Sequence, residues 1–237
     1  MGGTLVQGDM SRGKMAILHK SELIGQNGFF QPSALRHLPV SGFGGGTLIA
    51  TDDGYVPMDW LRPGDQLLTY NDGFQKVRWI GRDCLVEQPQ NTAAVRLPAG
   101  EAVEKPNAQG TLLAARHRVL LTGWQVELHF GMGTILAEAH DFGFPLDHFS
   151  PTAPERMACS LVLLDRPQII LANGYWVESL QLTSATKACL TETATSKIGE
   201  LGLDPAHHIR PAAGCMQPWE ARALGLELRS LCATAPR

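Results

Sequence analysis

The sequence lacks the features that would place it in several large functional classes. No stretch approaches the roughly 20 consecutive apolar residues that a membrane helix requires, so we expect no membrane partner. Lys and Arg form no run and the formal net charge is −3, which argues against nucleic acid as a partner. The start, Met1 to Thr4, has no charged segment followed by an apolar run, so no secretory signal is visible. We therefore expect a cytoplasmic protein, with non-classical secretion left open.

Cysteine is scarce and has no recognisable spacing. The five cysteines are Cys84, Cys159, Cys189, Cys215 and Cys232. Their odd number, wide spacing and lack of a C-x-x-C pair favour buried or free thiols in a reducing compartment over disulfides or a zinc site.

Cofactor and metal motifs are absent as well. The glycines of 42–46 are followed by Thr47 and a strand pattern, so they do not form a phosphate-binding loop. His207 and His208 do not have zinc-site spacing to Cys215, and we interpret them as a surface pair. We predict no cofactor and no metal.

What is present is a series of short apolar runs separated by turn residues. The chain has 237 residues, of which 44% are hydrophobic, enough for a sizeable core. Asp72-Gly73 between two apolar runs predicts a hairpin, because glycine supplies the positive φ of a tight turn. We expect strands at 47–51, 66–70, 74–80, 93–97, 111–115, 119–122, 125–130, 161–164, 169–172 and 175–177. The pattern is typical of an all-β sandwich or barrel.

The strand pattern does not cover the whole chain. Residues 1–40 read as an N-terminal extension, in which 21–28 and 33–37 have weak helical character. A single helical turn is expected at 59–61, and helices at 183–203 and 218–231. We predict three parts: an extension at 1–40, an all-β domain at 41–181 and a helical tail at 182–237.

The block 42–81 resembles the opening of Hint (hedgehog/intein) domains, in particular a bacterial group that begins Cys-Phe-x-x-Gly-Thr-x-Ile. Later blocks agree with the family's histidine-containing block and with its closing strands. The matching segments are 46–49, 53–54, 61–65, 78–81, 116–121, 163–166, 172–174 and 178–179. The resemblance spans 42–180 and implies the horseshoe-like β fold of this family.

The resemblance also implies a reaction on the domain's own backbone. Hint domains convert the peptide bond before their first residue into a thioester by an N-to-S acyl shift. A thiolate attacks the carbonyl, and a histidine protonates the departing nitrogen. The histidine position falls on His117 and an aspartate position on Asp165. If the chain is active, its substrate is therefore an intramolecular peptide bond.

Other expected site positions carry residues that cannot perform this chemistry. The cysteine position falls on Gly42, and the Thr or Ser that would assist the oxyanion falls on Ala114. A second histidine position falls on Pro167, and Glu178-Ser179 replace the terminal His-Asn pair of inteins. The resulting hypothesis is a Hint domain that has lost self-cleavage and acts as a structural or binding module with an unknown partner.

The same residues also allow other roles. Ser41 would act as the nucleophile with His117 if the register slipped by one residue. His117 can equally be a hydrogen-bonded core histidine, and Asp165 a turn residue. Asn173-Gly174 fits a hairpin turn better than a cyclising asparagine. An unrelated β-barrel that binds a ligand in an apolar pocket is a further possibility.

Overall fold

The computed structural model describes residues 41–82, 94–97, 110–141, 144–145 and 159–224. All of them belong to one compact unit, Leu35–Arg237. The weak helical segments expected at 21–28 and 33–37 lie outside the described residues.

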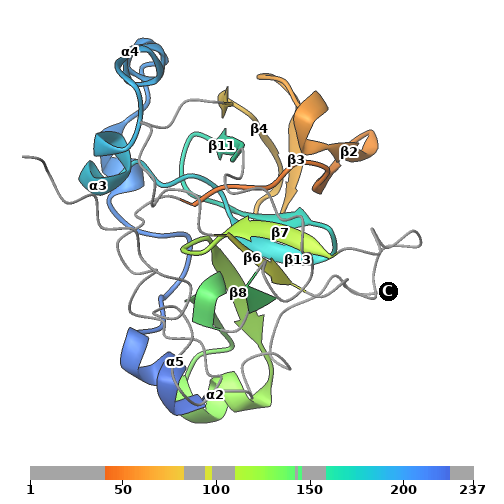
Figure 1. The fold of residues 1–237 in the computed structure, drawn as a ribbon, viewed down its shortest axis with the longest axis vertical. Helices are drawn as coiled ribbons and strands as arrows, with labels where there is room; N and C mark the ends of the chain where they lie inside the picture. Colours follow the sequence, from red (N-terminus) through yellow and green to blue (C-terminus); the bar gives the residue numbers. More distant parts are fainter. Residues whose placement is uncertain (1–40, 83–93, 98–109, 142–143, 146–158, 225–237) are drawn as a thin grey trace, which may run out of the picture. The chain divides into compact units, whose positions relative to one another are not determined.

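The main sheet has eight strands, all paired antiparallel. Seven follow the order β2-β1-β3-β12-β13-β8-β9, and β4 pairs with β3 (Figure 1). The strands are β1 (Leu48–Thr51), β2 (Gly54–Pro57), β3 (Gln66–Thr69), β4 (Gly73–Lys76), β8 (Arg118–Thr122), β9 (Thr134–Glu138), β12 (Ile169–Ala172) and β13 (Tyr175–Glu178). Every residue of β12 and β13 is buried, which explains the continuous apolar run of the first of these strands.

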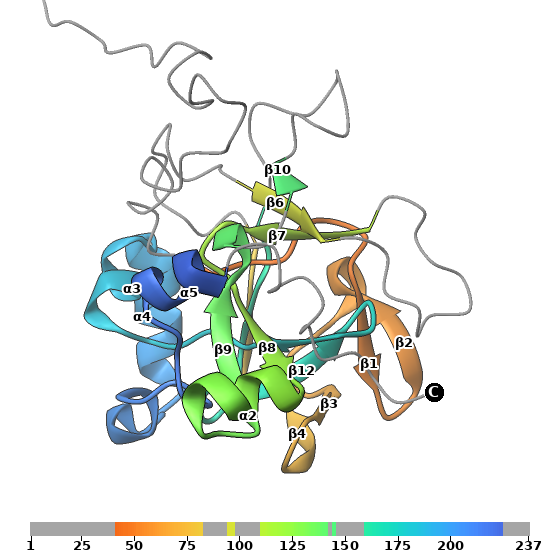
Figure 2. The same cartoon turned by 90° about the horizontal axis from the view of Figure 1, so that it is seen from below.

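Two smaller sheets complete the described strands. One has the order β10 (Phe144–Pro145), β6 (Ala94–Leu97), β7 (Thr111–Ala114), which Figure 2 shows as a stack of short arrows. The other pairs β5 (Trp79–Gly81) with β11 (Leu161–Leu163). The largest core cluster draws on all three sheets, with Ile49, Val95, Leu113, Val119, Val162 and Ile170 among its buried members. The all-β prediction is confirmed.

Two predicted strands are wrong. The strand expected at 74–80 is two strands, β4 and β5, which pair with β3 and β11 in different sheets. Residues 125–130 lie in helix α2 (Trp124–Phe130), not in a strand. Gly123 and Gly131, both with positive φ, lie at its two ends, and Gly131 is a left-handed C-cap. Only Val126 is buried, because α2 packs a narrow face on β8 and β9 (Figure 2). An alternating segment this short fits either period, and the flanking glycines favour the helix.

The remaining helices are short. The single turn expected near Asp59 is η2 (Met58–Trp60), and η3 (Ala139–Asp141) follows β9. The expected helix over 183–203 is two helices, α3 (Ser184–Ala188) and α4 (Glu192–Glu200), because Thr191 begins a second one by accepting a hydrogen bond from the Ala194 amide. Then come η5 (Pro205–His208) and α5 (Pro218–Leu224), the described part of the helix predicted at 218–231. No described helix is long and apolar enough to cross a membrane.

Candidate active site at the Ser41–Gly42 peptide bond

The segment that begins at Ser41 is held between two strands of different sheets. Phe43 forms one bridge to Leu113 and another to Ser160. Its amide donates to the Ser160 carbonyl at 2.9 Å, and the Ser160 amide donates back at 2.8 Å. On the other side, the Ala114 amide donates to the Gly42 carbonyl at 2.9 Å. These bonds fix Gly42 in one register.

His117 lies against Gly42. Its Nδ1 is 3.1 Å from the Gly42 nitrogen and 3.1 Å from the Gly42 oxygen. The Gly42 amide donates to Nδ1 in the tautomer that carries its proton on Nε2, whereas a protonated Nδ1 donates to the Gly42 oxygen. The Phe43 ring packs edge-on with its centroid 4.5 Å from that of the imidazole. The histidine thus lies beside the nitrogen that leaves if the Ser41–Gly42 bond is cleaved.

Burial makes His117 hard to protonate. The ring is 1% exposed, and this desolvation lowers its pKa from 6.5 to about 4. The nearby backbone groups of Gly42 and Glu178 oppose the change, whereas the charge of Arg118 adds to it. Within the described residues, Nε2 is buried without a hydrogen-bond partner. His117 is therefore a neutral imidazole at pH 7, and its proton would have to be acquired for an acid step.

Ala114 offers little support for an oxyanion. It carries no hydroxyl, and its amide donates to the Gly42 carbonyl. Its own carbonyl accepts from the His117 amide at 2.9 Å, so this residue joins β7 to the histidine. The position thus orders the backbone around His117 rather than facing a developing charge.

A thiol occupies the space beside Gly42. A Cβ built on Gly42 would lie 2.8 Å from the Cβ of Cys159, 3.2 Å from its Sγ and 3.4 Å from Leu161. Cys159 is itself buried. The sequence did not predict this neighbour, because the contact depends on the pairing of Phe43 with Ser160, far apart in the chain.

The family model of the Hint domain matches residues 41–184. The chain belongs to the Hint domain family. This is a family of autoprocessing domains, and the match makes the alternative of an unrelated β-barrel ligand binder wrong.

Solved structures similar to this Hint domain include two inteins. The gp41-1 intein is 10% identical, with 58% of this chain and 98% of that chain covered and a TM-score of 0.36. A DnaB intein from Synechocystis sp. PCC 6803 is 14% identical, with 60% and 99% covered and a TM-score of 0.37. No curated protein matches the chain.

Ser41, the alternative nucleophile, lies at the rim of this site. It is half-buried and lines a cavity of about 300 Å³ together with Arg116, Arg118, Glu138 and Cys215. No hydrogen bond joins its side chain to His117 in the described part of the Hint domain, where the histidine bonds to Gly42 instead.

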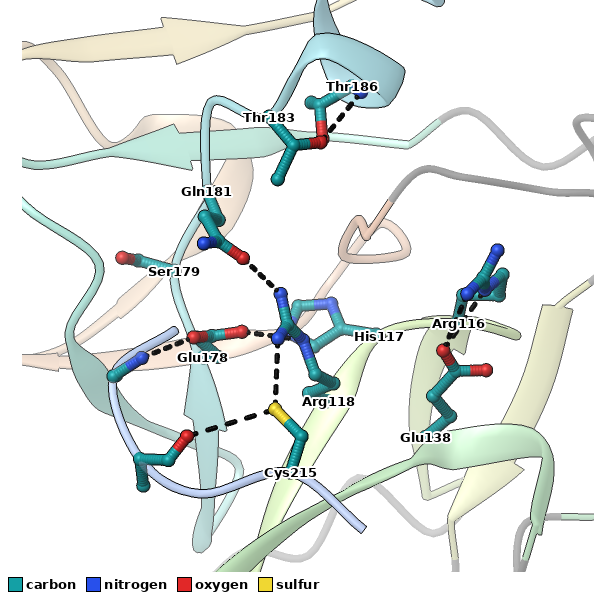
Figure 3. A network of polar contacts seen from close by, with 12 residues as sticks. Arg116, His117, Arg118, Glu138, Glu178, Ser179, Gln181, Thr183, Thr186 and Cys215 are labelled. Carbon is teal, nitrogen blue, oxygen red and sulfur yellow. Dashed lines mark hydrogen bonds and ion pairs between the residues drawn. The ribbon is translucent and has the colours of Figure 1, made fainter. Parts of the chain in front are cut away.

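An ion pair joins Arg118 to Glu178, a residue that the family resemblance aligned with the terminal His-Asn pair of inteins. Figure 3 shows Arg118 between Glu178, Gln181 and Cys215. Its Nε is 2.7 Å from Glu178 Oε2, and Nη2 donates to Gln181 Oε1 at 2.7 Å. Burial raises the pKa of Glu178, and the Arg118 charge lowers it. Cys215 Sγ accepts from Arg118 Nη1 at 3.1 Å, and burial raises the pKa of this thiol. Arg118, Glu178, Gln181 and Cys215 therefore each have a polar partner in this arrangement.

The other expected positions do not join the site. Asp165 pairs with Arg78 at 2.8 Å, and its side chain is 58% exposed. Ser179 Oγ accepts from the Gln168 amide at 3.0 Å and so connects two strand ends. Asn173 lies in the turn between β12 and β13, as the hairpin interpretation expects.

The structure also corrects one reading of the histidine pair. His207 is exposed, but His208 is buried, and its Nδ1 accepts from the Leu182 amide at 3.5 Å. His208 is therefore a core residue of the tail rather than a surface one. Among the residues that the structure describes, no group of three or more His, Cys, Asp or Glu side chains could hold a metal ion.

Proposed function

We propose that this Hint domain holds the Ser41–Gly42 peptide bond at His117 but does not cleave it by the family's N-to-S acyl shift. One observation carries the proposal. The acid position is filled, with His117 Nδ1 3.1 Å from the Gly42 nitrogen, while residue 42 has no side chain to attack with. The acyl shift needs a sulfur or oxygen on the residue that follows the scissile bond.

The surroundings support the same conclusion. The Ala114 amide is engaged by the Gly42 carbonyl, so its N–H does not await an oxyanion. Glu178 and Ser179, which the resemblance aligned with the terminal His-Asn pair of inteins, have no side chain that cyclises as asparagine does, and Glu178 pairs with Arg118. Without an attacking group on residue 42, the family's acyl shift does not release the N-terminal segment. The domain then serves as a structural or binding module.

The alternative, attack by Ser41 with His117, requires the Val40–Ser41 bond to lie at the histidine. The ladder that holds Phe43 between Leu113 and Ser160 argues against this slip. The two contacts of His117 Nδ1 are also both with Gly42. A serine hydroxyl furthermore needs stronger activation than a thiol, and His117 makes no contact with it.

The predicted division into parts enters this proposal as well. The extension 1–40 precedes the held bond, the domain occupies 41–181, and the tail 182–237 follows. The family match at 41–184 supports the domain boundaries. Leu190, Ala194 and Ile198 of the tail pack on Trp79 and Leu163, which supports a tail that covers the domain.

The test is intact-mass measurement on the full-length chain carrying Cys159→Ala, which removes the thiol beside Gly42 and isolates residues 41 and 42. We expect a single full-length mass after incubation with hydroxylamine at neutral pH. Fragments split at Val40–Ser41 or Ser41–Gly42 that vanish when Ser41→Ala is added would overturn the proposal in favour of the serine route.

A further inference from the structure

The geometry points to Cys159 as the nucleophile for the Ser41–Gly42 bond, attacking from a neighbouring strand in place of the missing side chain of residue 42. The inference rests on the proposed function in one respect, namely that the Ser41–Gly42 bond is the one held at His117. It goes further by supplying the attacking group that residue 42 lacks.

The first support is the shared volume. A Cβ on Gly42 would lie 3.2 Å from Cys159 Sγ, so the thiol occupies the space into which a side chain on residue 42 would extend. The paired hydrogen bonds between Phe43 and Ser160, at 2.9 and 2.8 Å, hold the two segments together immediately beside this contact. Backbone pairing therefore keeps Cys159 beside Gly42, the residue that follows the scissile bond.

The second support is independent of the thiol. His117 Nδ1 lies at the nitrogen that would depart, and its ring is buried with Nε2 unpartnered in the described part of the chain. Ser41, on the acyl side of the bond, lines a cavity of about 300 Å³ with Arg116 and Arg118. A small nucleophile in that cavity can therefore reach the acyl group after it has been transferred.

The step balances without an added oxidant, reductant or cofactor. Cys159 Sγ forms a bond to the Ser41 carbonyl carbon, and the Ser41–Gly42 C–N bond breaks. The Gly42 nitrogen gains one proton through His117, and the proton lost by the thiol restores the histidine. The product is a branched chain with a free amine on Gly42 and a thioester between Ser41 and Cys159.

This product predicts a distinctive readout. The branched chain has the same mass as the starting chain, and it stays a minor species because an amide is more strongly stabilised by resonance than a thioester. Water or hydroxylamine removes the acyl group and releases residues 1–41 as the acid or the hydroxamate, leaving 42–237. Trapping with hydroxylamine therefore makes the reaction visible as two fragments, whereas the branched chain alone does not change the mass.

The experiment treats the full-length chain with neutral hydroxylamine and follows intact mass over time. Wild type is expected to yield residues 1–41 as the hydroxamate together with 42–237. Cys159→Ala should lower the rate by about tenfold or more, because it removes the attacking atom. Cys189→Ala is the matched control, since it removes a thiol of the tail helices and should leave the rate unchanged. Ser41→Ala should also cleave.

The outcomes separate this inference from the proposed function. If wild type and Cys159→Ala both stay intact, the inference is overturned while the proposed function stands. If cleavage survives Cys159→Ala but is lost in Ser41→Ala, both are overturned. Loss of cleavage in Cys215→Ala instead of Cys159→Ala would assign the reaction to the thiol that lines the cavity and overturn the inference. A denaturant unfolding curve of Cys159→Ala that matches wild type excludes misfolding as the cause of lost cleavage.

Discussion

Between positions 42 and 159 there is room for only one side chain, and that of Cys159 occupies it. The Cβ that any other residue would add at position 42 meets the Cβ of Cys159 at 2.8 Å. A Cβ is attached directly to the backbone, so it cannot rotate out of the way. Glycine at 42 is thus required by the presence of Cys159, whatever role the thiol has.

This pair predicts the cost of restoring the family's cysteine. Gly42→Cys should lower the free energy of unfolding by about 1–3 kcal/mol, the usual cost of overpacking a buried site. The double variant Gly42→Cys/Cys159→Gly should recover most of this loss, because it moves the side chain from one partner to the other. Urea unfolding of the two variants measures both effects.

Gly133→Ala is the control for this experiment, since a Cβ at Gly133 meets no atom within 4 Å. It should change the stability little. A Gly42→Cys variant as stable as wild type would mean that the segment around Gly42 and Cys159 moves apart freely, and the shared volume would no longer explain the glycine.

At the scale of elements, the β12–β13 hairpin depends on its turn. Asn173 has a positive φ of 47°, which an L-residue other than asparagine or glycine adopts only at a cost. Its Oδ1 accepts from the Leu48 amide at 2.9 Å, and its own amide donates to the Leu48 carbonyl at 2.8 Å. The turn therefore also anchors the start of β1, the strand that follows the Gly42 segment.

Two substitutions separate these contributions. Asn173→Ala should lower the free energy of unfolding by roughly 2–3 kcal/mol, because it adds backbone strain and leaves the Leu48 amide without its acceptor. Asn173→Gly should cost less, since glycine accepts the positive φ and only the side-chain bond is lost. Chemical unfolding measures the order. Equal losses in both variants would mean that the φ angle contributes nothing.

The Arg118–Glu178 pair connects β8 and β13 in the same way. The Glu178 side chain is 3% exposed, so its charge depends on Arg118. Arg118→Met should destabilise the domain by about 3–5 kcal/mol, whereas Arg118→Met/Glu178→Met should recover most of that loss. A double-mutant cycle in thermal unfolding measures the coupling. Additive losses would show that the two side chains do not depend on each other.

Some of these strands and helices can be predicted from the sequence alone. The hairpin at Asp72-Gly73 and the strands around β1, β3 and β12 follow from turn residues and apolar runs, which act locally. The sequence predicts a strand where helix α2 forms, because seven residues with one buried position, Val126, do not distinguish the two periods. Its flanking glycines, Gly123 and Gly131, were the available signal.

The candidate site was also predicted only in part from the sequence. Gly42, Ala114 and His117 came from the family resemblance, and the structure brings them together. Asp165, predicted from the same resemblance, pairs with Arg78 at the surface instead. The position of Cys159 beside Gly42 could not be predicted from the sequence, because it depends on the pairing of Phe43 with Ser160. Local patterns do not contain such a long-range register.

Across the whole molecule, the His117 site places a titratable group in the core in its neutral form. The unfolded chain binds a proton on this histidine below pH about 6.5, whereas the folded domain binds it only below about 4. Between these values the unfolded state holds more protons, so protonation favours unfolding there. The contribution of neutral His117 is complete above pH 6.5 and is lost as the pH falls toward 4.

The domain should therefore lose stability on acidification over this window. His117 alone accounts for a loss of roughly 3 kcal/mol at most, since each pKa unit corresponds to about 1.4 kcal/mol. Urea unfolding from pH 7 to 4 should show a clear slope in wild type and a flatter one in His117→Asn. His207→Gln removes an exposed histidine and is the matched control, which should keep the wild-type slope. If His117→Asn kept that slope and His207→Gln flattened it, the acid sensitivity would belong to the tail. His117 would then be protonated in the folded domain well above pH 4, already carrying the proton that departure of the Gly42 nitrogen needs.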